Sequence, residues 1–243
     1  DRAVELLRNA RQPLVMVGSG AMAASAEVLA LAERLQAPVV SFRGGRGVVS
    51  DEHPLGFNCA QGFLRWEETD VLVGIGSRLE LQWFRWPKPR QPMKLVNIDI
   101  DPAQIPRLIP DVGIVSDARL GARALDDALA AAGVRNSSRH AEYEAVKARA
   151  DAAVQKVQPH MAFLKAIRAA LPRDGFFVEE ICQAGFTSYY GLPVYEPRTF
   201  VTCGPQGTLG FGFPTALGVK AGNPNRAVVS ITGDGGFLFG VQD

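Results

Sequence analysis

Residues 13–20 read PLVMVGSG, and this stretch decides the fold class. Apolar residues run without interruption to Val17 and then give way to glycine, a pattern typical of a strand that is buried on both faces. A segment rich in Ala and Leu follows with helical periodicity, from about Ser25 to Gln36. A buried strand followed directly by a helix predicts a β-α unit of a parallel sheet.

Further β-α units follow along the chain. The predicted strands read PVVSF, VLVGIG, KLVNIDID and VGIVSD, at residues 38–42, 71–76, 94–101 and 112–117. Apolar strands that alternate with helices indicate a doubly wound sheet covered on both faces. An Ala-rich helix at about 119–132 closes the series. We therefore expect residues 1–133 to form a Rossmann-like domain that is a candidate for nucleotide binding.

A second series begins after a polar link. Residues 134–158 are predicted to form a linker and a solvated connecting helix. From residue 159 the pattern predicts a second domain, 159–243, with a helix to about 171, strands at 176–180, 199–202 and 227–232, a glycine-rich helix from about 210 and a last helix near Phe237. The first helix of the chain has no N-cap, and the chain stops before the second sheet could be completed, so both ends look cut. The expected fold class is α/β, with two doubly wound parallel-sheet domains, the second incomplete.

Composition and charge exclude several classes of function. The 243 residues are 47% hydrophobic, and 26 basic against 25 acidic residues give a formal charge of +1. This balance favours neither nucleic acid nor an anionic membrane as a partner. No apolar run approaches the roughly 20 residues of a membrane helix, and the start has no signal-peptide layout. Three widely spaced cysteines without a C-x-x-C pair argue against a disulfide framework or a zinc site, so we expect a cytoplasmic protein that binds small molecules.

The first glycine cluster, GSGAMA at residues 18–23, fits the pattern G-x-G-x-x-A after a strand. Such a turn can present backbone amides to a phosphate. An NAD site also needs an acidic residue at the end of the second strand, where residues 41–43 read SFR instead. A site for another nucleotide and a purely structural turn both stay open. Asp99 and Asp101 follow a strand, where they could bind ribose hydroxyls or cap the next turn.

A second glycine cluster, GDGG at residues 233–236, suits a different ligand. The carboxyl ends of parallel strands line the ligand crevice of such sheets, which places Asp234 where ligands bind. The glycines let backbone amides approach a phosphate closely, but Asp234 would repel that phosphate unless a cation lay between them. A magnesium ion that bridges Asp234 to a diphosphate resolves the conflict. An Asx-type turn that merely ends the strand is the alternative.

Another glycine-rich stretch, CGPQGTLGFGFPTALGVKAG at residues 203–222, precedes the GDGG cluster. Each interior glycine weakens a helix by about 1 kcal/mol relative to alanine, which indicates that something approaches this backbone closely. Leu209 would present an apolar side chain beside bare backbone, and this suits the edge of a flat heteroaromatic ligand. Tight packing of a helix on the sheet is the alternative.

In this order, GTLGFGFPTALGVKAG and GDGGF resemble two segments of thiamine diphosphate-dependent enzymes of the acetolactate synthase and 2-oxo acid decarboxylase group. The first is similar to the family segment that binds the aminopyrimidine, and the second to the start of its metal-diphosphate motif. PLVMVGSG, ETDVLVGIGSRL and VNIDIDPAQI are similar to the family's middle domain. The resemblance spans nearly all of the chain and implies a middle domain followed by the first half of a diphosphate-binding domain.

The resemblance implies thiamine diphosphate and Mg²⁺ as cofactors and the following contact residues: Gln183, Gly207, Leu209, Gly233, Asp234, Gly235 and Gly236. Asp234 would be a magnesium ligand, and the neighbouring glycines would offer backbone contacts to the diphosphate. The Gly207 carbonyl and the Leu209 amide would bond the aminopyrimidine, while the Leu209 side chain supports the bent cofactor. Ala184 stands where the acetolactate synthase branch has histidine, which weakens the assignment to true acetolactate synthase.

The family's middle domain holds FAD in acetolactate synthases, and other nucleotides or none in relatives. The matching places here are occupied by Gly18, Gly20, Arg78, Asp99 and Asp117, so the resemblance implies that FAD or another nucleotide could bind. The loop RLELQWFRW at residues 78–86 departs from the FAD-binding branch. No catalytic residue is assigned, because the family's glutamate lies in an N-terminal domain and its asparagine pair lies beyond the GDG motif. We expect cofactor activation to be absent from this chain alone.

The expected function is that of a fragment of a thiamine diphosphate- and Mg²⁺-dependent lyase or carboligase, acetolactate synthase-like, that acts on a 2-oxo acid. Family active sites form between subunits, which implies that the whole protein is a homodimer or homotetramer. Two alternatives of other classes stay open. One is a non-catalytic nucleotide-binding module on the first sheet, and the other is a dimer scaffold.

Overall fold

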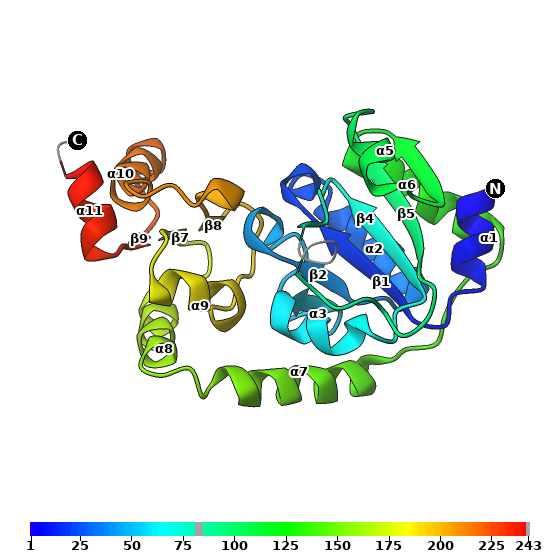
Figure 1. Ribbon diagram of the computed structural model, residues 1–243, viewed down its shortest axis with the longest axis horizontal. Helices are drawn as coiled ribbons and strands as arrows, with labels where there is room; N and C mark the ends of the chain where they lie inside the picture. Colours follow the sequence, from blue (N-terminus) through cyan, green and yellow to red (C-terminus); the bar gives the residue numbers. More distant parts are fainter. Residues whose placement is uncertain (81–84, 242–243) are drawn as a thin grey trace.

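The computed structural model describes residues 1–80 and 85–241 and contains two parallel sheets joined by a long helix (Figure 1). The first sheet has six strands in the order β3-β2-β1-β4-β5-β6, and all of its pairs are parallel. This is the order of a doubly wound fold, whose ligand crevice lies at the carboxyl ends of the strands where the order reverses. The strands are β1 (Pro13–Val17), β2 (Val39–Ser41), β3 (Gly56–Asn58), β4 (Val71–Ile75), β5 (Lys94–Asp99) and β6 (Val112–Val115).

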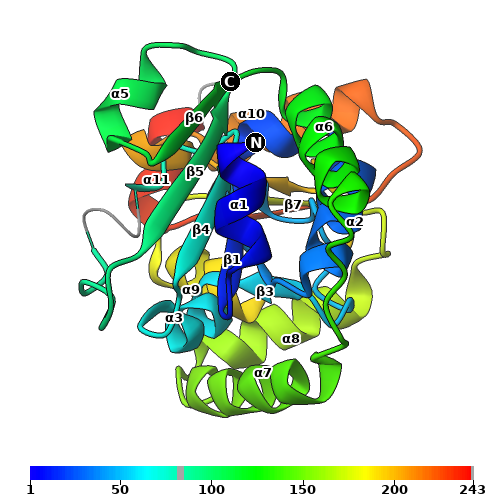
Figure 2. The same cartoon turned by 90° about the vertical axis from the view of Figure 1, so that its right-hand side faces the viewer.

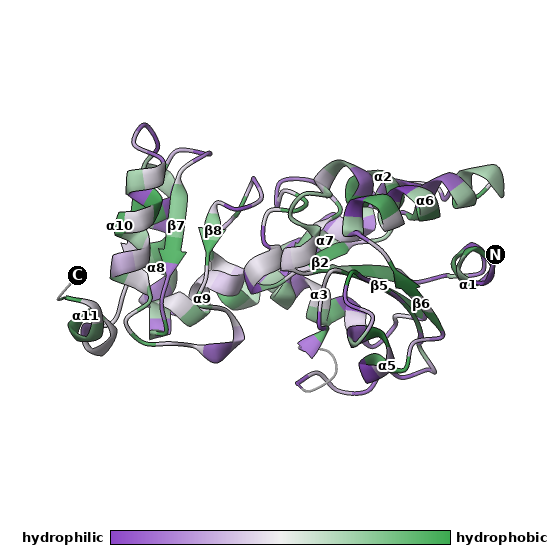
Figure 3. Cartoon of the chain, turned by 90° about the horizontal axis from the view of Figure 1, so that it is seen from above, coloured by the Kyte–Doolittle hydropathy of each residue, from purple (hydrophilic) through white to green (hydrophobic). Residues whose placement is uncertain are grey.

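Helices cover both faces of the first sheet. Figure 3 shows α2 and α6 on one side of it and α3 and α5 on the other, and Figure 2 shows β6, β5, β4 and β1 side by side. Because both faces are covered, every residue of β1 and β4 is buried, as their uninterrupted apolar sequences predict. The helices of this unit are α1 (Arg2–Arg8), α2 (Ser25–Leu35), α3 (Cys59–Trp66), α5 (Gln104–Leu108) and α6 (Ala118–Ala131).

The long helix α7 (His140–Val154) connects the two sheets along one side of the molecule (Figure 1). The expectation of a solvated helix holds only for its outer face. Tyr143 is fully buried against the first unit, and its hydroxyl donates to the carbonyl of Gln36 at 2.6 Å. Neither α7 nor any other helix in the described part of the chain is long and apolar enough to span a bilayer.

The second sheet has three parallel strands in the order β8-β7-β9: β7 (Phe176–Glu179), β8 (Phe200–Val201) and β9 (Val228–Ile231). Figure 1 shows α8 (His160–Ala170) and α9 (Gln183–Gly191) on one side of it and α10 (Gly212–Gly222) and α11 (Asp234–Gly240) on the other. The prediction of an α/β fold with two doubly wound parallel sheets is therefore confirmed.

The observed elements differ from the expected ones in several places. β3 and α3, which together make one short β-α step, were not predicted from the sequence, and neither was α9. The glycine-rich helix α10 begins at Gly212 rather than near residue 210. The last helix, α11, begins at Asp234 rather than near Phe237, so the GDGG cluster forms its N-cap and first turn and is not a loop that precedes it.

The two units are held together by a loop of the first unit, residues 42–53. Its Asp51 amide donates to the carbonyl of Val194 in the second unit at 3.0 Å. The ammonium group of Lys147 on α7 donates to the carbonyls of Asp51 and His53, at 3.0 and 2.6 Å. This loop therefore contacts both the connecting helix and the second unit.

Candidate functional site

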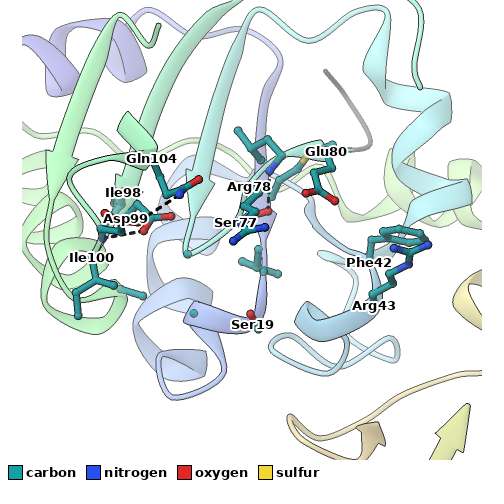
Figure 4. A pocket seen from close by; sticks show the side chains of 18 of the residues that line it. Ser19, Phe42, Arg43, Ser77, Arg78, Glu80, Ile98, Asp99, Ile100 and Gln104 are labelled. Atoms are coloured by element: carbon teal, nitrogen blue, oxygen red, sulfur yellow. Dashed lines mark hydrogen bonds between the residues drawn. The ribbon is translucent and has the colours of Figure 1, made fainter. Parts of the chain in front are cut away.

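A cleft of about 830 Å³ lies at the carboxyl ends of the central strands of the first sheet. Figure 4 shows Asp99 and Gln104 at one end of it, Arg78 near the middle, and Phe42 and Arg43 at the other end. All five residues predicted for a nucleotide line it: Gly18, Gly20, Arg78, Asp99 and Asp117. The structure therefore brings this predicted set together at the place where doubly wound folds bind ligands.

The glycine loop of the cleft is occupied by contacts within the protein. The amides of Gly18 and Gly20 donate to the carbonyls of Ile75 and Gly76, at 3.2 and 3.1 Å. The amides of residues 21 and 22 donate to carbonyls of the same turn. A Cβ on Gly18 would overlap the carbonyl oxygen of Gly76. The close approach of these two turns explains the glycines, as the structural alternative proposed.

The carboxylates of the cleft act as local caps. Asp99 accepts the amide of Asp101 at 3.0 Å, and Asp101 accepts the amide of Ala103 at 2.9 Å. This second bond, together with one from Gln104, lowers the pKa of Asp101 below its ordinary value. Asp117 is the N-cap of α6 and accepts the amides of the next turn.

These contacts do not fit a nucleotide whose diphosphate is held by the glycine loop, because four of its amides already have acceptors within the protein. Binding of FAD stays a prediction of the resemblance. Within the departing loop RLELQWFRW, residues 81–84 lie outside the described part of the chain.

The second unit also lines the cleft, through Pro205 and Gln206. Arg43 has a left-handed backbone with φ of 46°, and its guanidinium lies 5.0 Å from the ring centre of Phe42 and 5.3 Å from that of Tyr189. A cation between two aromatic faces is held in place without an ion pair. The cleft is thus formed by both units.

The residues predicted to contact thiamine diphosphate lie at the carboxyl ends of β7 and β9. Asp234 is exposed, and no hydrogen bond or ion pair reaches its carboxylate from the described residues. The space in front of Gly235 is open, because a Cβ there would meet no atom within 4 Å. A free carboxylate beside bare backbone fits a hard divalent cation that also binds phosphate oxygens.

The second predicted segment, Gly207 to Leu209, is also free of internal partners. Gly207 has φ of 61°, which favours glycine, and Leu209 is 45% exposed. Within residues 1–80 and 85–241, no backbone hydrogen bond uses the carbonyl of Gly207 or the amide of Leu209. The donor and acceptor that an aminopyrimidine would need are therefore available.

Gln183 completes the predicted set, as the first residue of α9 with an exposed side chain. The preceding Cys182 accepts the amide of Gly185 at its sulfur, at 3.3 Å. The Cβ of Cys182 also lies 3.3 Å from the position of a Cβ on Gly233. The start of α9 therefore lies beside the start of α11, which brings Gln183 to the same end of the sheet as Asp234.

Two buried glutamates at the end of β7, Glu179 and Glu180, were not singled out from the sequence. Glu179 accepts hydrogen bonds from the hydroxyls of Tyr189, at 3.0 Å, and Thr202. Burial raises the pKa of Tyr189, and the negative charge of Glu179 raises it further. The same two causes, in the same order, raise the pKa of Cys203 to about 11. The Cys203 thiol is therefore protonated at neutral pH and is no nucleophile there. Glu180 faces the glycine segments instead.

No group of three His, Cys, Asp or Glu side chains in the described ranges could hold a metal by itself. Among the described residues, Asp234 is thus the one side chain predicted to bind the metal ion. Magnesium retains waters and phosphate oxygens and takes only one or two carboxylates, so a single carboxylate beside a diphosphate site is consistent with its chemistry.

Comparison with protein families gives two matches. Residues 1–125 match the family model described as "Thiamine pyrophosphate enzyme, central domain". Residues 180–243 match the model described as "Thiamine pyrophosphate enzyme, C-terminal TPP binding domain". The first match covers more than half of the chain and contains every residue that lines the cleft except Pro205 and Gln206. The second contains the segments 203–222 and 233–236.

Curated relatives match over nearly the whole chain. A probable 2-ketoarginine decarboxylase of Pseudomonas aeruginosa is 33% identical over an alignment 249 positions long that covers 99% of this chain and 44% of the relative. A probable acetolactate synthase large subunit of Methanocaldococcus jannaschii is 31% identical over an alignment 270 positions long that covers 100% of this chain and 44% of the relative. The glyoxylate carboligase of Escherichia coli O157:H7 is also 31% identical, over 264 residues. The chain thus spans less than half the length of these relatives.

A solved structure has the same fold. The thiamine diphosphate-dependent 4-hydroxybenzoylformate decarboxylase of Rhodococcus jostii RHA1 superposes with a TM-score of 0.72 at 20% identity. The superposition covers 99% of this chain and 46% of that one.

Proposed function

The chain belongs to the thiamine pyrophosphate enzyme family, and we propose that the whole protein is a thiamine diphosphate- and Mg²⁺-dependent lyase or carboligase that acts on a 2-oxo acid. The curated relatives include a decarboxylase, a carboligase and acetolactate synthases, which supports this choice of reaction classes. Thiamine diphosphate stabilises the carbanion that such reactions require.

One observation carries the proposal. The free carboxylate of Asp234 and the unbonded backbone of Gly207 to Leu209 lie at the same end of the second sheet, on segments that both contact Glu180. A ligand that carries both a metal-bound diphosphate and an aromatic ring needs a site for each: the carboxylate would serve the first and the unbonded backbone the second. Neither the structural turn nor tight helix packing explains why both places are exposed.

Each residue has a defined task in this proposal. Asp234 holds the magnesium ion, and the amides of Gly235 and Gly236 face the diphosphate. The carbonyl of Gly207 and the amide of Leu209 orient the aminopyrimidine, and the exposed Leu209 side chain packs against the cofactor. The starts of α9 and α11 are in contact, so Gln183 and Gly233 would both lie beside the diphosphate.

Calorimetric titration of the whole protein with thiamine diphosphate, with and without Mg²⁺, tests the proposal. We expect binding that depends on Mg²⁺ and is lost in Asp234→Ala. Asp174→Ala is the matched control, because Asp174 is an exposed aspartate whose carboxylate pairs with Arg226. Absence of binding to the wild type, or undiminished binding to Asp234→Ala, would contradict the proposal.

The proposal includes two features of the whole protein. We propose a homodimer or homotetramer, and a division of this chain into residues 1–133, 134–158 and 159–243, with the glycine segments in the last part. Exposed apolar side chains on α10 and α11 support an assembly, among them Leu217, Leu238 and Phe239, at 48, 68 and 73% exposure. Sedimentation of the whole protein measures the number of subunits.

A further inference from the structure

Glu180 lies directly after β7 and is fully buried. One carboxylate oxygen accepts the amide of Gly210 at 2.6 Å, and the other accepts the amide of Gly212 at 2.9 Å. These amides belong to the segment that follows Leu209. The carboxylate therefore fixes the backbone on one side of the predicted aminopyrimidine contact.

The same carboxylate supplies the cap that α10 lacks. The N-cap residue of α10 is Phe211, whose side chain cannot accept a hydrogen bond, and Gly212 is the first residue of the helix. A negative group at a helix N-terminus accepts otherwise unpaired amides and interacts favourably with the helix dipole. Glu180, from a different part of the chain, takes this place.

Glycines on two segments make room for Glu180. A Cβ on Gly212 would lie 2.7 Å from one carboxylate oxygen, and a Cβ on Gly236 would overlap the other. Gly236 belongs to the first turn of α11, next to Asp234 and Gly235. Glu180 therefore contacts the pyrimidine segment and the metal-diphosphate segment with the two oxygens of one carboxylate.

The burial of Glu180 is not balanced by a cation. Within the described residues, no Lys, Arg or His forms an ion pair with it. A buried carboxylate without a cation is costly, and the two amide bonds are its compensation. A side chain that only filled space at this junction would be better apolar.

We propose that Glu180 is a positioning residue that holds the segment from Gly207 to Gly212 against the first turn of α11 in the arrangement that receives thiamine diphosphate. The inference rests on the proposed function for the identity of the ligand. It assigns Glu180 no contact with the cofactor. Glu180 raises the fraction of cofactor-free molecules in which both segments already have the binding arrangement, and the apparent affinity for the cofactor rises with that fraction.

Two measurements on the whole protein test the role of Glu180. Glu180→Gln keeps the shape of the side chain but presents an NH₂ group to one of the two amides, so one acceptor is lost. We expect thiamine diphosphate to bind this variant about tenfold or more weakly. We also expect peptides that cover residues 207–213 to exchange their amide hydrogens about tenfold faster in the protein without cofactor. Glu179→Gln is the matched control, because Glu179 is equally buried at the preceding position and accepts hydrogen bonds from hydroxyl groups. The affinity and the exchange rate of this variant should both stay near wild type.

A second pair of variants tests the contact with α11. Gly236→Ala places a methyl group against the carboxylate, and we expect it to weaken binding by about tenfold or more. Glu180→Asp shortens the side chain and retains both oxygens, so the double variant should bind better than Gly236→Ala alone. This rescue would not occur if the two residues acted independently.

The outcomes separate this inference from the proposed function. If the wild type binds no thiamine diphosphate, the proposed function fails, whereas hydrogen exchange without cofactor still decides whether Glu180 holds the segment. If the wild type binds but Glu180→Gln has unchanged affinity and unchanged exchange, the positioning role is overturned. A lower melting temperature of Glu180→Gln with unchanged affinity would overturn it as well, since it would show a purely structural cap.

Discussion

The guanidinium of Arg46 and the carboxylate of Asp51 form a bidentate pair, at 3.0 and 2.7 Å, that joins the two units. Arg46 also donates to the carbonyl of Leu192, and Asp51 accepts the amide of Val194, at 2.6 and 2.8 Å. The Arg46 side chain is completely buried and that of Asp51 is 12% exposed. Both units therefore depend on the same buried charges.

Loss of Arg46 should destabilise the protein strongly. Arg46→Met leaves Asp51 buried without its cation, and removing one partner of such a pair costs about 3–5 kcal/mol. Urea unfolding of the variant and the wild type measures this loss in the free energy of unfolding. The double variant Arg46→Met/Asp51→Asn should lose less than the sum of the single variants. Additive losses would contradict a direct pair.

Replacement of Gly18 should destabilise the fold whether or not a nucleotide binds. In Gly18→Ala the new methyl group meets the carbonyl of Gly76, and such overpacking costs about 1–3 kcal/mol. Gly218→Ala is the control, because a Cβ there meets nothing within 4 Å and lies inside α10. The same chemical change should stabilise that helix by about 1 kcal/mol. Thermal unfolding of both variants tests this difference: the melting temperature should fall in Gly18→Ala and rise in Gly218→Ala.

Leu209 should matter for the cofactor and not for the fold. Its side chain is 45% exposed, so Leu209→Ala should change the unfolding free energy by less than about 0.5 kcal/mol. Loss of apolar contact should weaken thiamine diphosphate binding about tenfold. Leu120→Ala removes an exposed leucine side chain from α6 of the first unit and should alter neither quantity. Equal affinities of the two variants would remove Leu209 from the site.

Protonation of His53 should destabilise the fold below pH 6.5. Burial lowers the pKa of His53 from its ordinary value of 6.5, against the attraction of Glu33 and with help from His140 and Lys147. As the pH falls, His53 therefore takes up a proton in the unfolded state before it does so in the folded state. Neutral His53 makes its full contribution to the free energy of unfolding above pH 6.5, and this contribution is lost as the pH falls through the lower pKa of the folded state. Its Nδ1 also accepts the amide of Leu55 at 3.2 Å, and a proton there would break this bond.

Urea unfolding at pH 7.5 and 5.5 measures this effect. The wild type should lose more stability over this interval than His53→Gln. His160→Gln, which changes a histidine at the start of α8, should behave as the wild type. An equal loss in His53→Gln would contradict the prediction.

Most of the strands could be predicted because they are short apolar runs, and β1, β2, β4 and β7 are buried along their whole length. β3 and α3 could have been found, since Asn58 and Gln61 form a capping box with the spacing that sequence can show. Glu180 could not, because its partner amides lie 30 and 32 residues away and nothing local marks it. The sequence also could not decide whether Gly18 serves a nucleotide or a tight turn, because the deciding contact is with Gly76, which follows β4 far along the chain.

The contact between Gly18 and Gly76 also affects how the glycine pattern would change during evolution. Selection for a folded protein is enough to retain Gly18, since any larger residue meets the next turn. A lineage that lost a nucleotide from this cleft would keep the pattern unchanged. The acidic side chains of the cleft also cap local turns, whereas no hydrogen bond or ion pair from the described residues holds Arg78, so position 78 would be the first to record the loss.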